Sequence, residues 1–176
     1  MTEAVRTFLA FLAVLSQVAL GVLLMLAFFR RPALAAVRDA LRGAELWLAW
    51  LVAAVATAGS LYFSEVANYL PCELCWYQRI AMYPLVIVLA VAAVLRLRGV
   101  SLTVLPLVLV GAAFSVYHYQ LEWFPEQKTI CTQGIPCNVI WFRELGYVTI
   151  PLLALTAFAL IAVLLAFDVF RRREGS

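Results

Sequence analysis

The four cysteines of this chain form two close pairs, and an arginine follows the first pair. Cys72, Cys75 and Arg79 stand in the stretch CELCWYQR at positions i, i+3 and i+7, and Cys131 and Cys137 follow later in the chain. On an α-helix the first spacing puts its three side chains on one face. Paired cysteines exchange between dithiol and disulfide, staple a fold or bind a metal ion.

The residue before the first pair indicates where its helix begins. Pro71 precedes Cys72, and proline suits the first turn of a helix. Backbone N–H groups are unpaired in that turn and the helix dipole is positive there. Both effects lower a thiol pKa and favour the thiolate, which is the nucleophilic form. We therefore expect a reactive dithiol in the first turn of a helix.

The elements that must position these residues are membrane spans. Hydrophobic residues make up 66% of the 176 residues, a composition typical of integral membrane proteins. A spanning helix needs about 20 apolar residues, and five segments meet or approach this length: 8–29, 46–63, about 74–95, 102–121 and 147–167. We predict an all-α membrane bundle of four helices, 45–176, preceded by one extra transmembrane helix and its loop, 1–44. The first span is longer than a signal-peptide core and ends at Arg30 and Arg31, so we interpret it as retained.

The basic residues predict the orientation of these spans. If the spans alternate, nine of the thirteen basic residues fall on one side: Arg30, Arg31, Arg38, Arg42, Arg96, Arg98, Arg171, Arg172 and Arg173. Short loops rich in lysine and arginine face the cytoplasm. The N-terminus is then outside and the C-terminus inside. All four cysteines lie on the outer side, in or beside segments 64–71 and 122–146.

An even number of cysteines in an oxidising compartment favours disulfide chemistry. Two structural staples are one alternative, but closing the loop from Cys131 to Cys137 stabilises a fold by only about 2 kcal/mol, and the shorter loop by less. A zinc site with four cysteine ligands is another alternative. It fits the ligand count, whereas an oxidising compartment disfavours it, so we predict redox-active pairs and no metal.

Arg79 points to the electron acceptor. An arginine just inside a span is costly and marks a functional site by default, although its side chain can also extend to the lipid headgroups. A dithiol that served only soluble proteins would not need to lie at the lipid boundary. A quinone is a two-electron acceptor that diffuses in the bilayer, and Arg79 could hydrogen-bond to a ring oxygen and stabilise its developing charge.

His118 is the single histidine. It either belongs to an aromatic belt at the membrane interface or hydrogen-bonds to the quinone and supplies a proton, with Glu122 one turn away to orient it.

Glu73 and Gln78 are expected to point away from the reactive face, toward solvent or headgroups. Segment 138–147 alternates apolar and charged residues, which predicts an amphipathic segment along the membrane surface.

These residues resemble the DsbB/BdbC family of bacterial thiol:quinone oxidoreductases. The resemblance covers about residues 46–170 and rests on the CELCWYQR motif, the second cysteine pair, His118, and the later Trp141, Gly146, Ile150 and Pro151. It implies re-oxidation of a thioredoxin-like thiol oxidase of DsbA/BdbD type outside the cytoplasmic membrane, with ubiquinone or menaquinone as acceptor. It also implies that all four cysteines are catalytic and that Cys75, Arg79 and His118 contact the quinone.

Two features differ from typical members: the extra N-terminal span and the short separation of Cys131 and Cys137. One alternative function is a quinone reductase like vitamin K epoxide reductase. In that family the CxxC motif follows the loop cysteines, whereas here it precedes them, which favours DsbB. A second alternative is a non-catalytic membrane protein with two structural disulfides.

A membrane-impermeant thiol reagent, applied to intact cells after reduction, should label Cys131. The arginine asymmetry places residues 122–146 outside and residues 30–43 and 96–101 inside. Labelling that requires permeabilised cells would mean that the topology is inverted.

Overall fold

The structure is a computed structural model that describes residues 2–97, 99–132 and 134–174, the last three by backbone alone. Arg98 and the side chains of Arg172 and Arg173 therefore lie outside the described residues. The chain forms α1 (Thr2–Phe29), α2 (Arg31–Ala40), α3 (Glu45–Leu61), a π-helical turn (Tyr62–Val66), α4 (Glu73–Val94), α5 (Val100–Trp123) and α6 (Ile150–Glu174). The prediction of an all-α protein is confirmed.

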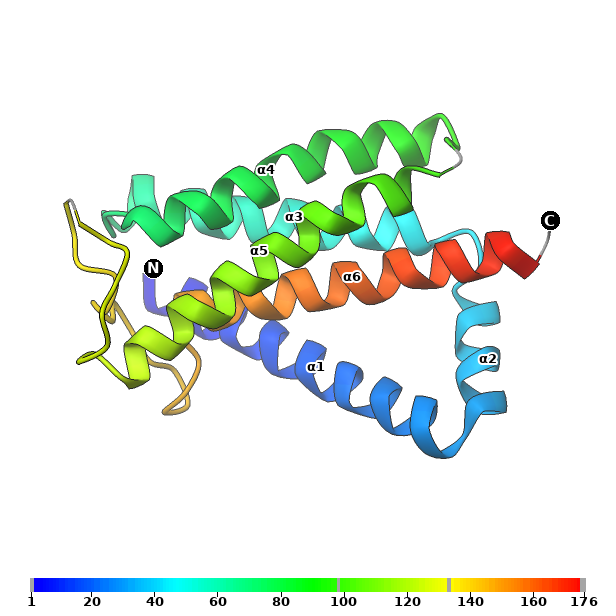
Figure 1. The fold of residues 1–176 in the computed structure, drawn as a ribbon, viewed down its shortest axis with the longest axis horizontal. Coiled ribbons are helices and arrows are strands. Elements are labelled where there is room, and N and C mark those ends of the chain that lie inside the picture. The colour runs from blue at the N-terminus through cyan, green and yellow to red at the C-terminus, as the bar shows by residue number, and fades with distance from the viewer. Residues whose placement is uncertain (1, 98, 133, 175–176) are drawn as a thin grey trace.

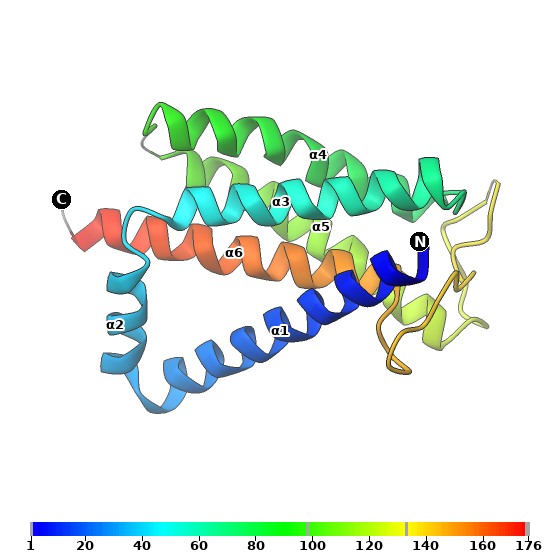
Figure 2. The ribbon, with the colours of Figure 1, turned by 180° about the vertical axis from the view of Figure 1, so that it is seen from behind.

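Five of these helices are long and apolar enough to cross a membrane: Thr2–Phe29, Glu45–Val66, Glu73–Val94, Val100–Trp123 and Ile150–Arg171. They match the five spans expected from the sequence to within a few residues. Helices α3 to α6 run side by side along the long axis of the molecule (Figure 1). The segment from α5 to α6 lies at one end of the bundle, together with the start of α4, and we call this the cysteine end. The C-terminus lies at the opposite end (Figure 2).

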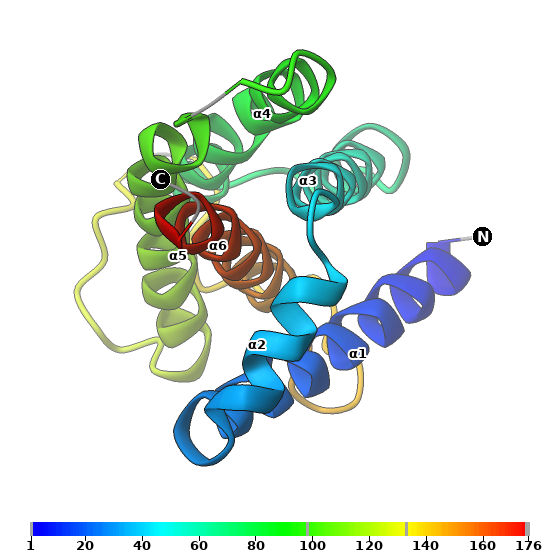
Figure 3. The same cartoon turned by 90° about the vertical axis from the view of Figure 1, so that its right-hand side faces the viewer.

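Helix α6 is the centre of the bundle. It packs against α1, α3 and α5, and the end-on view shows it surrounded by these helices (Figure 3). The side chain of Phe158 is fully buried. A Cβ atom added at Gly111 of α5 would lie 2.3 Å from the ring of Phe158, so this glycine allows α5 and α6 to approach closely.

A buried polar network closes the end opposite the cysteines. Asp168 of α6 accepts a hydrogen bond of 2.6 Å from Ser101 of α5 and pairs with Arg171 at 2.6 Å. Arg171 also pairs with the buried Glu45 of α3 at 3.0 Å. Buried charges are tolerated when they are paired in this way, and the network fixes three helices relative to one another.

Helix α1 leaves the bundle at an angle, and α2 bridges its far end to α3 (Figure 1). The segment after the first span was expected to be a loop, but residues 31–40 are helical. Pro32 near the helix start and four alanines favour this helix.

Segment 138–147 is also different from the expectation. It is a turn with an isolated bridge between Glu144 and Val148, in which Phe142 is buried and Leu145 is exposed. Phe142 and Leu145 therefore do not share the apolar face that was expected, whereas the position of this segment along the membrane surface stays a prediction. The alternating pattern reflects a folded turn, in which Leu145 has a φ of 52° and interrupts any helix.

Candidate functional site

The first cysteine pair lies at the N-terminus of α4. Cys72 is the N-cap, with φ −80° and ψ 175°, and its sulfur accepts a hydrogen bond from the Cys75 backbone N–H at 3.4 Å. The helix thus begins at Glu73, and Pro71, which was expected in its first turn, lies outside it. This places Cys75 in the first helical turn and leaves Cys72 at the boundary with the preceding loop.

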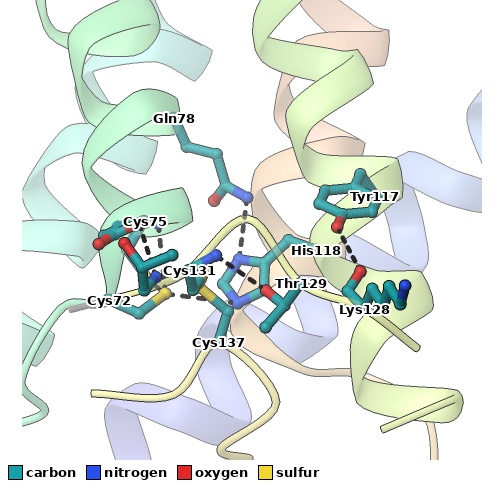
Figure 4. The surroundings of a disulfide bond; sticks show 11 residues. Cys72, Cys75, Gln78, Tyr117, His118, Lys128, Thr129, Cys131 and Cys137 are labelled. Atoms are coloured by element: carbon teal, nitrogen blue, oxygen red, sulfur yellow. Dashed lines mark hydrogen bonds between the residues drawn. A yellow bond between two sulfur atoms is a disulfide. The ribbon is translucent and has the colours of Figure 1, made fainter. Parts of the chain in front are cut away.

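The two sulfurs of this pair lie 3.1 Å apart as free thiols. Cys72 is buried, whereas Cys75 is partly exposed. The close approach follows from capping geometry, because the side chain of an N-cap residue turns back over the first helical turn. The pair is therefore positioned to form a disulfide with little backbone movement (Figure 4).

Two residues, one on α5 and one on α4 itself, extend the site inward from Cys72. His118 of α5 places its Nε2 3.6 Å from the Cys72 sulfur. Its Nδ1 lies 3.1 Å from the Gln78 side-chain nitrogen. An amide nitrogen donates, so Nδ1 accepts and the proton of the neutral ring lies on Nε2, facing Cys72. Both side chains are buried, with 3% and 6% of their surface exposed.

Sequence reasoning assigned Gln78 to the solvent or headgroups, and this was wrong. Gln78 follows Cys75 by three residues, which is the spacing of neighbours on a helical surface. That spacing was the available signal, and the packing of α4 against α5 turns this part of the surface inward. Glu73 is partly exposed and also contacts the second cysteine loop, since its carboxylate accepts a 3.4 Å hydrogen bond from the Thr132 backbone N–H.

The Cys75 thiol and His118 together lower the pKa of Cys72 to about 4. The largest cause is a hydrogen bond from the Cys75 thiol, and the hydrogen bond from His118 acts in the same direction, while burial opposes them. The thiolate is consequently favoured at neutral pH. The helix-start effect expected from sequence is joined here by two specific side-chain contacts.

The second pair forms a disulfide that lies over the first pair. Cys131 and Cys137 are bonded, with their Cα atoms 6.2 Å apart. Cys137 is 1% exposed and belongs to one buried cluster with Cys72, Leu74 and Leu121. Cys131 packs at the edge of the cluster and is partly exposed. Cys137 of the disulfide is therefore buried, and Cys131 lies nearer the surface.

A cavity of about 310 Å³ lies on the other side of Cys75. Its lining is mostly apolar and comes from α1, α3, α4 and α6, with Tyr69 and Trp141 at the cysteine end. The polar and reactive groups along its α4 wall are Cys75, Gln78, Arg79 and Tyr83. Ligand pockets in proteins commonly measure about 300–1,000 Å³ and combine apolar walls with few polar groups.

Arg79 is fixed at this wall by two contacts. Its guanidinium donates a 3.2 Å hydrogen bond to the Ser60 carbonyl of α3 and lies 5.4 Å from the centre of the Trp76 ring. Arginine carries five N–H donors, so further donors remain for a ligand in the cavity. The side chain lies along the cavity and is partly buried.

A second, small cavity lies on the Cys72 side. Its lining includes Cys72, Cys75, His118 and Glu122. Cys75 is thus shared by both cavities, whereas the structure places His118 beside Cys72 and outside the lining of the large cavity. Glu122 is buried next to His118, one turn further along α5.

The sulfurs of Cys72 and Cys75 and a ring nitrogen of His118 lie within 4.8 Å of one another and could hold a metal ion. A structural zinc site uses four protein ligands, and these three groups fall one short. The adjacent disulfide and apolar cavity fit thiol exchange better than metal storage.

The reduced Cys72 should remain a thiolate far below the pKa of an ordinary cysteine. In a Cys131→Ser/Cys137→Ser variant, its ultraviolet thiolate absorbance should fall only as the pH approaches about 4. His118→Ala should move this midpoint upward, because it removes a hydrogen bond that favours the thiolate. An unchanged midpoint in His118→Ala would show that the histidine does not influence Cys72.

Comparison with known proteins agrees with this geometry. A family model described as "Disulfide bond formation protein DsbB" matches residues 43–168. Disulfide bond formation protein C of Bacillus subtilis (strain 168) is 46% identical over 120 residues, which cover 67% of this chain and 87% of that protein. A probable disulfide formation protein of Oceanobacillus iheyensis is 46% identical over 122 residues, covering 68% and 84%.

A probable disulfide formation protein of Deinococcus radiodurans is 43% identical over 139 residues, covering 72% of this chain and 89% of that protein. No solved structure matches. The chain belongs to the DsbB family of disulfide bond formation proteins, and it is a multi-pass membrane oxidoreductase of disulfide bond formation.

Proposed function

We propose that this protein re-oxidises a thioredoxin-fold thiol oxidase of DsbA/BdbD type outside the cytoplasmic membrane and passes the electrons to a membrane quinone. The observation that carries the proposal is the position of Cys75. Its side chain contributes to the apolar cavity that also contains Arg79, and its sulfur lies 3.1 Å from that of Cys72. A dithiol in this position connects a disulfide at the cysteine end to a cavity between membrane helices.

Exchange begins at the second pair. A partner thiolate attacks Cys131, which is partly exposed, and the Cys131–Cys137 bond breaks to give a mixed disulfide and a Cys137 thiolate. Cys137 then attacks Cys72 of an oxidised Cys72–Cys75 pair and releases the Cys75 thiolate. Burial of Cys137 in one cluster with Cys72 favours this step, because exchange needs access to one specific sulfur.

The partner's second thiolate then releases Cys131, which re-forms its bond with Cys137 and frees Cys72. The partner has lost two electrons and two protons, and Cys72 and Cys75 have become a dithiol. This pairing is the one in the structure. The lowered pKa of Cys72 makes it a good leaving group in this step, since thiols of lower pKa leave faster.

A bound quinone supplies an acceptor for two electrons and two protons. The residues of the large cavity fit such a ring, with apolar walls along most of the surface and the Arg79 guanidinium to bind and orient a carbonyl oxygen. Loss of two electrons and one proton returns the Cys72 thiolate and the Cys75 thiol to a disulfide, and the second proton that a quinone takes up on reduction comes from solvent. His118 stabilises the Cys72 thiolate through its Nε2–H, on the side of the dithiol away from this cavity.

Quinone-dependent oxidation of a reduced thioredoxin-fold oxidase by the purified full-length protein tests this proposal. Arg79→Ala should raise the half-saturating concentration of decylubiquinone at least about tenfold, because a hydrogen bond to a charged group contributes about 1.5–3 kcal/mol. Disulfide exchange with the partner, measured without quinone, should stay unchanged.

The matched control is Arg143→Ala, which removes a cation that stacks on Trp123 at 4.7 Å without lining the large cavity. It should leave quinone saturation as in the unmodified protein. If Arg79→Ala and Arg143→Ala have the same half-saturating quinone concentration, Arg79 does not bind the acceptor. Absence of quinone-dependent activity in the unmodified protein would overturn the proposed function itself.

A further inference from the structure

Helix α1 lies outside the segment that matches the family, which begins at residue 43, yet it contributes to the large cavity. Four of its residues line that cavity: Leu9, Leu12, Ala13 and Ser16. They recur at intervals of three and four positions and so form one helical face. The cavity beside Cys75 is therefore bounded by the four-helix bundle on most sides and by α1 on one.

The other face of α1 has a different environment. Phe11, Leu15 and Val18 have at least half of their side-chain surface exposed and are absent from the cavity lining. A membrane span exposes such residues to lipid. Helix α1 therefore carries a leucine at the cavity wall, Leu12, and another on its exposed face, Leu15.

Two polar contacts fix α1 against the bundle near the cavity. Gln17 donates a 3.0 Å hydrogen bond to the Thr156 hydroxyl of α6, and it accepts one of 3.1 Å from the Tyr147 hydroxyl. Polar side chains that pair between spans stabilise helix association in membranes. Gln17 follows Ser16 directly, so this contact holds the lining residues in register.

At the cysteine end, α1 is joined to the segment that precedes α6. Arg6 pairs with Glu144 at 3.2 Å, and its guanidinium lies 5.7 Å from the centre of the Phe142 ring.

Helix α1 also approaches α3 closely at one point, where Leu9 meets Gly59. A Cβ atom added at Gly59 would lie 2.9 Å from Leu9, so the glycine accommodates this leucine at the cavity wall.

We propose that α1 is a functional wall of the acceptor site, in which Leu9, Leu12 and Ser16 hold the lipid-soluble acceptor beside Cys75. Without α1 the lining residues of α3 and α6 would face lipid, and the acceptor would be bounded on three sides only. This inference rests on the proposed function, because it assigns the extra helix to the acceptor half of that reaction.

The test is a single-turnover assay of the full-length protein in detergent. Cys131→Ser/Cys137→Ser is introduced into every protein compared, so that dithiothreitol reduces Cys72 and Cys75 alone. The reductant is removed, decylubiquinone is added, and free cysteines are counted by alkylation with maleimide–polyethylene glycol. The reduced pair gives two electrons to each quinone, so two alkylatable cysteines disappear per protein. The partner oxidase is not needed, and the acceptor step is measured alone.

Leu12→Trp fills the cavity from α1, whereas Leu15→Trp adds the same bulk to the exposed face. Leu12→Trp should raise the half-saturating quinone concentration at least tenfold with a maximal rate within about twofold of the unmodified protein. Leu15→Trp should match the unmodified protein in both values. Gln17→Leu, which loses the contacts to Thr156 and Tyr147, should raise the half-saturating concentration by about threefold.

Equal saturation in Leu12→Trp and Leu15→Trp would overturn the role of α1 and leave the proposed function intact. Absence of quinone-dependent thiol loss in the unmodified protein would instead overturn the proposed function. If Leu12→Trp does not accumulate, Ser16→Phe fills the same wall and is compared with Val18→Phe on the exposed face, with the same two outcomes.

Discussion

The arrangement depends on two sulfur atoms held 3.1 Å apart at the start of one membrane helix. Capping geometry turns Cys72 back over the first turn, where it joins the buried cluster around Cys137, and leaves Cys75 on the wall of an apolar cavity. The short CxxC spacing therefore does more than permit a disulfide. It gives each cysteine a different neighbourhood, and this asymmetry is what a relay between a protein disulfide and a lipid-soluble acceptor requires.

Burial of polar groups in a membrane bundle is costly unless they are paired. At the cysteine end, Gln78, His118 and Cys72 form a continuous set of contacts. At the opposite end, Asp168, Ser101 and Arg171 form another. The second network is far from every cysteine and fixes the bundle, whereas the first lies against the dithiol and controls its charge. Similar hydrogen-bond chemistry thus serves stability at one end and reactivity at the other.

The spans could be predicted because lipid demands a continuous apolar length, and the cysteines and Arg79 stood out because such residues are rare at a span edge. The burial of Gln78 could not be predicted with assurance, since helical spacing does not say which neighbour a face meets. In the turn at 142–148, Gly146 gives a turn signal, but the turn also needs Leu145 in the left-handed region, and a leucine does not predict that conformation. The cavity wall supplied by α1 depends on tertiary contacts such as that of Gln17 with Thr156, which leave no pattern in the sequence.

The account requires Cys137 to reach Cys72, and a variant that keeps only these two cysteines tests it directly. Cys75→Ser/Cys131→Ser should form an intramolecular Cys72–Cys137 disulfide after mild oxidation, detected by mass spectrometry as one pair of linked peptides. The matched Cys72→Ser/Cys131→Ser variant, which keeps Cys75 and Cys137, should form little. The account would be contradicted if both thiols of the first variant remained open to alkylation, or if the second variant linked equally well.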